Sequence, residues 1–266
     1  MIEDFLVKEG KKFKLSGVDP DFKSKKTKEE LKELTAKNVE KIVSLQEKLY
    51  AESKQSLLVV FQAIDGGGKD GTIKKVFSDI NPQGCVVTSF KTPTALELKH
   101  DFLWRIHQHT PEKGMIQVFN RSHYEDVLIV KVHGWIDDEE CGRRFHHIRA
   151  FEKLLSESGT KIVKIFLCIS KDEQKKRFEE RLKDPAKNWK FAQADLDERK
   201  FWDKYMEQYQ KVLSETSTGQ APWYVVPADS NSFRNYVVST IVLKALEDMD
   251  PHFPPPEAGL DKVQVI

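Results

Sequence analysis

A glycine-rich segment from Ala63 to Gly71, AIDGGGKDG, has the clearest chemistry in the sequence. It follows an apolar run at 56–64 and precedes a segment of helical pattern, which is the setting of a phosphate-binding loop. Glycines let several backbone N–H groups face one point, and the helix N-terminus adds partial positive charge. Lys69 adds a full charge that can reach a transferred phosphoryl group. We therefore predict that phosphate is bound by Gly66, Gly67, Gly68, Lys69, Asp70 and Gly71.

This loop departs from the GxxxxGK[ST] pattern at two positions. Ala63 replaces the first glycine, and Asp70 replaces the Ser or Thr that helps to hold Mg²⁺. A free Asp65 among phosphate-binding groups would repel a phosphate unless a metal ion lay between them. We therefore predict that Asp65 binds a metal ion or its water.

A second polar cluster, from Asn120 to Asp126, follows an apolar run at 115–119. Ligands of open α/β sheets bind at the carboxyl ends of strands, where this cluster would lie. A guanidinium group matches phosphate oxygens in a bidentate manner, so we predict that Arg121 contacts phosphate. Glu125 and Asp126 fit two interpretations. At least one of them has a metal-binding or catalytic role, or both are the favourable acids of a helix N-terminus.

A third cluster lies in the charged segment 171–190. Arg177 and Arg181 are four residues apart and share one helix face, with Lys187 and Lys190 just beyond Pro185. We predict that these four cations form part of a lid that contacts phosphate. The alternative is a solvated helix held by (i, i+4) ion pairs.

The surrounding pattern predicts the elements that position these clusters. Continuous apolar runs rich in β-branched residues indicate buried strands at 56–64, 85–90, 115–119, 162–169 and 223–226. Helical segments separate them at 27–53, 69–80, 94–108, 139–158, 171–183, 195–215 and 231–247. This alternation predicts a parallel sheet in a three-layer α/β/α fold, as one domain over residues 1–266. An N-terminal arm (1–27), lid helices (about 171–210) and an irregular C-terminal tail (249–266) complete the expectation.

Composition excludes several classes of protein. The 43 Lys and Arg balance 42 Asp and Glu, which argues against a nucleic-acid-binding protein. Three widely spaced cysteines, Cys85, Cys141 and Cys168, argue against a disulfide framework. The acidic start has no apolar segment after it, and no apolar run is long enough to span a membrane. We expect a cytoplasmic protein that binds neither nucleic acid nor membrane.

Three motifs together resemble polyphosphate kinase family 2. They are DGGGKDG from Asp65, FNRSHYED from Phe119, and RLKDPAKNWK from Arg181. The Asn-Arg-Ser-x-Tyr-Glu-Asp form is similar to class III of that family, which phosphorylates AMP and ADP. The resemblance extends from the Lys-rich arm to the segment ending at Asp229, and three motifs in this order are strongly specific.

The resemblance implies a phosphate-loop (P-loop) kinase fold with a helical lid. It implies Mg²⁺-dependent transfer of a phosphoryl group between inorganic polyphosphate and adenine nucleotides, with Mn²⁺ and guanine nucleotides as second choices, in a homo-oligomer. The residues carried over are Asp65 and Lys69 in the loop, Arg121 at the strand end, and Arg177, Arg181 and Lys190 in the lid. We expect catalysis by Asp65, Lys69, Arg121, Glu125 and Asp126, nucleotide binding by Asn120, Arg121 and Asp126, and metal binding by Asp65 and Glu125.

Two other functions fit the same motifs. An ATP-dependent nucleoside monophosphate kinase shares the fold, the loop and a lid, and differs in its donor. A non-catalytic sensor of nucleotides or polyanions would keep the loop without turnover.

Overall fold

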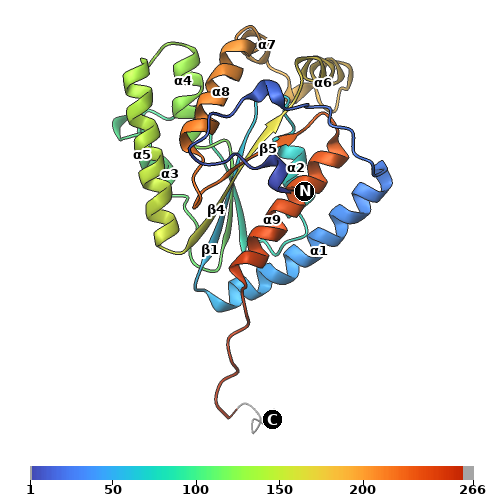
Figure 1. Cartoon of the computed structure of the whole chain (residues 1–266), viewed down its shortest axis with the longest axis vertical. Coiled ribbons are helices and arrows are strands. Elements are labelled where there is room, and N and C mark those ends of the chain that lie inside the picture. Colours follow the sequence, from blue (N-terminus) through green and yellow to red (C-terminus); the bar gives the residue numbers. More distant parts are fainter. Residues whose placement is uncertain (1, 260–266) are drawn as a thin grey trace.

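A parallel five-stranded sheet forms the centre of the molecule (Figure 1). The structure is a computed structural model that describes residues 2–259. The strand order is β2-β3-β1-β4-β5, and every neighbouring pair is parallel. The strands are β1 (Ser56–Gln62), β2 (Cys85–Ser89), β3 (Ile116–Asn120), β4 (Thr160–Cys168) and β5 (Trp223–Pro227). The predicted α/β fold with a parallel sheet is confirmed.

Helices cover both faces of this sheet. One apolar cluster packs α1 (Lys28–Glu52), α2 (Lys69–Phe77) and α9 (Asn231–Met249) on one face. A second cluster packs α5 (Asp138–Glu157) and α8 (Trp202–Thr216) on the other. Every residue of β1 is buried because the strand is central and covered on both sides, which accounts for the apolar run Leu57–Phe61 within it.

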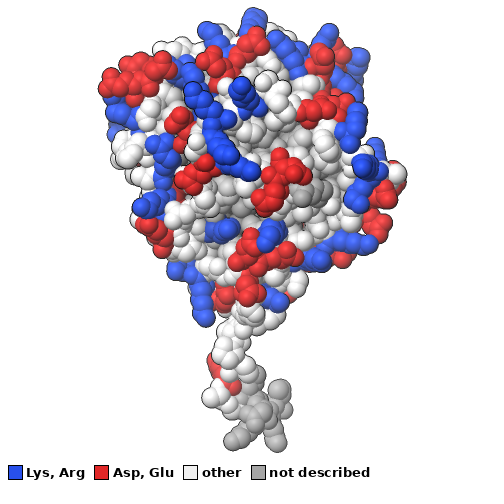
Figure 2. All heavy atoms as spheres, in the orientation of Figure 1, with Lys and Arg blue, Asp and Glu red and all other residues white. Residues whose placement is uncertain are grey.

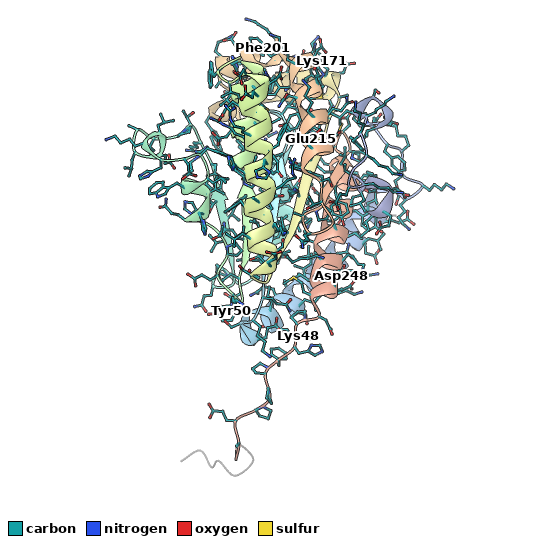
Figure 3. The ribbon with its side chains drawn as sticks, turned by 60° about the vertical axis from the view of Figure 1, so that its left-hand side comes forward. Lys48, Tyr50, Lys171, Phe201, Glu215 and Asp248 are labelled. Atoms are coloured by element: carbon teal, nitrogen blue, oxygen red, sulfur yellow. The ribbon has the colours of Figure 1, made fainter. Side chains whose placement is uncertain are left out.

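The segment after β4 leaves the sheet, and its last helix, α8, returns along the face that α5 also covers. It contains α6 (Lys171–Lys183), a 3₁₀ turn η5 (Asn188–Lys190), α7 (Gln193–Arg199) and then α8. Helix α6 ends where Asp184 is extended before Pro185, because the residue preceding a proline avoids helical geometry. Lys171 and Phe201 of this segment lie at the opposite end of the molecule from Tyr50 (Figure 3). The segment therefore stands over the carboxyl ends of the strands.

Two of the predicted helices are wrong in extent. The helix predicted at 94–108 is a 3₁₀ turn, η3 (Glu97–Lys99), followed by a short helix α3 (Trp104–His107). Leu96 and Leu98 in this segment are exposed, and His100 is extended between the two turns. The helix predicted at 195–215 is divided between α7 and α8, because Phe201 leaves helical geometry.

Short helical turns follow β3, where the sequence predicted no separate element. They are η4 (His123–Val127) and α4 (Ile129–Val132). Ser122 begins η4 by accepting a hydrogen bond from the backbone N–H of Tyr124. These turns carry the polar cluster away from the sheet immediately after Asn120.

The N-terminal arm lies against the last strand and the last helix. It contains the 3₁₀ turns η1 (Ile2–Phe5) and η2 (Leu15–Gly17), and Leu6 forms an antiparallel bridge with Tyr224. Phe22 stacks on Phe233 with ring centroids 4.9 Å apart. After α9, residues 250–259 form no helix or strand, and the rest of the predicted tail, 260–266, lies outside the described residues.

A fully buried polar network joins η4 to the sheet. Lys164 of β4 has no solvent exposure, and its Nζ donates to Glu152 Oε2 at 2.6 Å. The same Nζ donates to the Tyr124 hydroxyl at 2.9 Å and to the Thr216 carbonyl at 2.7 Å. Burial raises the pKa of Glu152, but Lys164 and His123 outweigh that effect, so the pKa lies below its ordinary value. The network fixes the turn that carries the second polar cluster.

Charges of both signs are spread over the surface. Lysine and arginine side chains alternate with acidic ones across the face seen in Figure 2, in keeping with a net charge of +1. Within residues 2–259, no helix combines the length and the apolarity that a bilayer crossing requires.

Candidate active site

The strand order brings the first two polar clusters together. β1 and β3 are neighbours with Phe61 opposite Asn120, so the loop after β1 lies beside the residues after β3. Asn120 Nδ2 donates to Asp70 Oδ1 at 2.8 Å, and Arg121 Nη2 donates to Asp65 Oδ1 at 2.5 Å. The loop, both strand-end residues and the four predicted lid cations line one cleft of about 1070 Å³.

Close packing explains the small residues of the phosphate loop. A Cβ on Gly67 would lie 2.5 Å from the Cβ of Ala63, so neither position has room for a larger side chain. Gly68 has a φ of +94°, a region that side chains strongly disfavour. Ala63 therefore fits where the common pattern has glycine.

Lys69 is buried at the phosphate loop. The side chain is buried with 8% exposure, and Nζ donates to the Ala63 carbonyl at 2.8 Å. Burial lowers the pKa of Lys69, Arg121 lowers it further, and three nearby carboxylates oppose the shift. A phosphate in the loop would supply the negative charge that this buried ammonium favours.

Arg121 has a backbone conformation that is rare outside glycine. Its φ is +63°, while its N–H still donates to the Phe61 carbonyl at 3.1 Å. Such strain persists where the surrounding structure enforces it, often at functional sites. Burial lowers the pKa of Arg121, but Glu125 and Asp65 outweigh that effect and leave the pKa above its ordinary value. The guanidinium is therefore charged and points into the cleft.

The two acids of η4 point to different places. Glu125 shares a small cavity of about 50 Å³ with Asp65 and Arg121. Burial raises the pKa of Glu125, and Arg121 and Lys69 oppose this. Asp126 lines neither cavity, and Arg105 Nη2 lies 3.5 Å from its Oδ2. The structure thus brings Glu125, and not Asp126, to the phosphate loop.

The predicted lid arginines face the cleft from α6. Arg177 Nη1 donates to the Gly66 carbonyl at 2.8 Å, and Nη2 donates to the Ala228 carbonyl at 2.7 Å. Its Nε donates to Glu173 Oε1 at 2.9 Å. Arg181 lies one turn further and its Nη1 is 3.4 Å from Asp195 Oδ2. Arg177 thus joins the lid segment to the loop and to the end of β5.

The two lid lysines are more loosely held. Lys187 Nζ lies 2.9 Å from Asp184 Oδ2, and Lys190 Nζ lies 5.0 Å from the centre of the Trp189 ring. Trp189 is 78% exposed and lines the same cleft. Both lysines line the same cleft as the phosphate loop.

The carboxylates at the loop suit a hard divalent ion. Asp65 and Glu125 line the same small cavity, the charge of Asp65 contributes to raising the pKa of Glu125, and both side chains supply oxygen. Within the described residues, no three His, Cys, Asp or Glu side chains gather closely enough to hold a metal by themselves. Mg²⁺ fits this donor set, because it commonly takes one or two carboxylates and completes its shell with water and substrate phosphates.

Arg234 of α9 is a cleft residue that sequence reasoning missed. It lies against the phosphate loop, and Asn231 and Asp229 line the cleft beside it. The sequence did contain a signal for this residue. Arg234 is the one charged residue between Asn231 and Leu243, a stretch that is otherwise neutral and largely apolar. Such an arginine is buried only where a polar site accepts it.

Comparisons with known proteins agree with this geometry. The family model described as Polyphosphate kinase 2 matches residues 23–254. An AMP/ADP-polyphosphate phosphotransferase of Meiothermus ruber is 46% identical, covering 99% of this chain and 100% of that protein. An ADP-polyphosphate phosphotransferase of Rhodopseudomonas palustris is 48% identical, covering 95% and 92%.

A solved structure extends the agreement to three dimensions. The crystal structure of polyphosphate kinase 2 from Arthrobacter aurescens superposes with a TM-score of 0.94 at 44% identity, covering 98% of this chain and 93% of that one. The match includes the parallel sheet, the phosphate loop and the segment above it. The chain therefore belongs to the polyphosphate kinase 2 family.

Proposed function

We propose that this protein transfers phosphoryl groups between inorganic polyphosphate and adenine nucleotides, converting AMP to ADP and ADP to ATP. The observation that carries the proposal is the cleft of about 1070 Å³. The phosphate loop lines this cleft together with four further cations, Arg177, Arg181, Lys187 and Lys190. A donor with one negative charge per phosphate needs such a row, because a single nucleotide would occupy only part of it.

The roles that we propose for the loop and the strand end follow from their contacts. Lys69 and the loop N–H groups hold the transferred phosphoryl group, and Arg121 reaches it from the neighbouring strand. Asn120 orients the start of α2 through Asp70 and faces the nucleotide phosphates. Phosphoryl transfer requires mainly in-line placement and neutralised charge, and the acceptor phosphate is already ionised at neutral pH.

We propose that Asp65 and Glu125 hold Mg²⁺, which Mn²⁺ could replace. When bound, the ion would neutralise charge on the reacting phosphates. The metal role of Glu125 keeps the expectation from the resemblance, and its place beside Asp65 supports it, whereas Asp126 pairs with Arg105. We propose in addition that α6 and α7 act as a lid, which would exclude water from the donor.

The deciding experiment supplies polyphosphate as the only donor. The protein is incubated with Mg²⁺, polyphosphate and AMP or ADP, with no ATP added, and ATP is measured by luciferase luminescence. We expect ATP from ADP directly and from AMP after a lag, and about 10²–10³ times slower formation from a Lys69→Ala variant. Phosphorylation of AMP by ATP but not by polyphosphate would favour the nucleoside monophosphate kinase. Absence of turnover with either donor would favour the non-catalytic sensor.

A further inference from the structure

Two arginines from different helices meet at one glycine of the phosphate loop. A Cβ on Gly68 would lie 2.2 Å from Nη1 of Arg234 and 3.3 Å from Nη1 of Arg177. Arg234 comes from the first turns of α9 and Arg177 from α6. Gly68 is therefore required both for its positive φ and for the space that the Arg234 guanidinium occupies.

Arg234 is buried without an acidic partner in the described part of the chain. Its residue exposure is 3%, yet it hydrogen-bonds only to neutral amide oxygens. Nη1 donates to Asn231 Oδ1 at 2.8 Å, and Nε and Nη2 lie 3.4 and 3.3 Å from Asn235 Oδ1. These bonds use three of the five guanidinium N–H groups. Two N–H donors remain for a ligand.

The charge of Arg234 has no paired carboxylate among the described residues. Burial and the neighbouring Arg177 lower the pKa of Arg234 to about 9, and Glu173 opposes this only in part. Buried cations are normally paired with an anion, because removal from water disfavours an isolated charge. Arg177 has its own carboxylate in Glu173, so the surplus positive charge belongs to Arg234.

We propose that Arg234 and Arg177 form a phosphate subsite for the polyphosphate chain, adjacent to the phosphate held by the loop. Both arginines line the same cleft as Gly68 and Lys69, and their guanidinium groups converge on the loop. A phosphate between them would accept bidentate hydrogen bonds and supply the missing negative charge. Both arginines belong to this chain. The inference rests on the proposed function only for the identity of the ligand, polyphosphate.

Binding of inorganic tripolyphosphate, measured by isothermal titration calorimetry without nucleotide, tests the subsite directly. We expect Arg234→Gln to weaken the Kd by about tenfold or more, as for loss of a charge-assisted contact. Lys244→Gln, on the same helix but paired with Asp248 at the surface, is the charge-matched control and should leave the Kd unchanged. The KM for polyphosphate should rise in the Arg234→Gln variant while the KM for ADP changes little.

Thermal unfolding separates this role from a purely structural one. Because Arg234 is an uncompensated buried charge, Arg234→Gln should leave the ligand-free Tm unchanged or raise it. It should also reduce the rise in Tm that tripolyphosphate produces. If the variant does not fold, Arg234→Lys takes its place, because an ammonium cannot reproduce the two-pronged contact.

A wild-type Kd for tripolyphosphate in the folded variant would overturn the subsite. The proposed function would then still stand if the wild-type protein makes ATP from polyphosphate. If the wild-type protein makes none, the proposed function fails, whereas a weakened Kd in Arg234→Gln would still support a polyanion subsite.

Discussion

Replacing Lys164 with methionine tests whether the buried network supports the site as described. Methionine keeps most of the volume of the lysine stem and removes the charge and three hydrogen bonds. Glu152, with almost no exposure, would then be left as a buried carboxylate without its main partner. The turn that contains Tyr124 would also lose its anchor to β4.

The expected loss of stability follows from this geometry. Breaking a buried ion pair by removing one partner costs about 3–5 kcal/mol, because an uncompensated charge remains. For a chain of this size, that loss lowers Tm by roughly 6–20 °C. Breaking a solvent-exposed ion pair would cost at most about 1 kcal/mol, so the measured loss of stability distinguishes a buried pair from an exposed one.

The assay is urea unfolding followed by circular dichroism, with Tm from a thermal scan. Lys161→Met, on the same strand but partly exposed, is the matched control and should change stability by only about 0.5 kcal/mol. The double variant Lys164→Met with Glu152→Leu removes both charges and should recover part of the loss.

Two results would refute this reasoning. One is a Lys164→Met variant whose stability falls by no more than that of the Lys161→Met control. The other is a double variant as unstable as the sum of its parts, which would mean that the two charges do not depend on each other.

Three further predictions concern the site itself. Lys69→Ala should lower kcat by about 10²–10³ with the fold intact, and a folded variant that keeps a tenth of the wild-type rate would contradict the role of Lys69. Asp65→Asn and Glu125→Gln should each raise the Mg²⁺ concentration needed for half-maximal rate, and unchanged Mg²⁺ titrations in both would exclude them as metal residues. Replacing Arg177 and Arg181 with Gln should raise the KM for polyphosphate more than that for ADP, with added salt mimicking part of the effect; equal KM changes would argue against a lid specific for polyphosphate.

The sequence predicted the sheet and the loop because their signals are local. An apolar strand followed by three glycines and Lys69 needs no distant contact to be recognised. The meeting of this loop with Arg121 was also predictable, since parallel strands end at a common edge. The structure confirms both the fold and this juxtaposition.

The features that could not be predicted from the sequence depend on contacts that form only in the folded chain. Asp126 and Glu125 are adjacent and chemically alike, and only the course of η4 decides which one faces the loop. Arg234 is separated from the loop by more than 160 residues, and α9 reads as a core helix. The helix predicted at 94–108 is wrong because a helical sequence pattern does not show whether its apolar residues will be buried, and Leu96 and Leu98 are exposed.

Most cations of the cleft contact oxygen atoms of the protein itself. This holds for Lys69, Arg121, Arg177, Arg181 and Lys187, each of which contacts a carbonyl or a carboxylate of the chain. Ligand entry is therefore an exchange reaction, in which phosphate oxygens must displace several internal acceptors. A free orthophosphate can replace few of them, whereas a long chain replaces many in succession and gains from each. On the proposed function, a cleft whose cations are engaged in this way would favour a polyphosphate chain over orthophosphate.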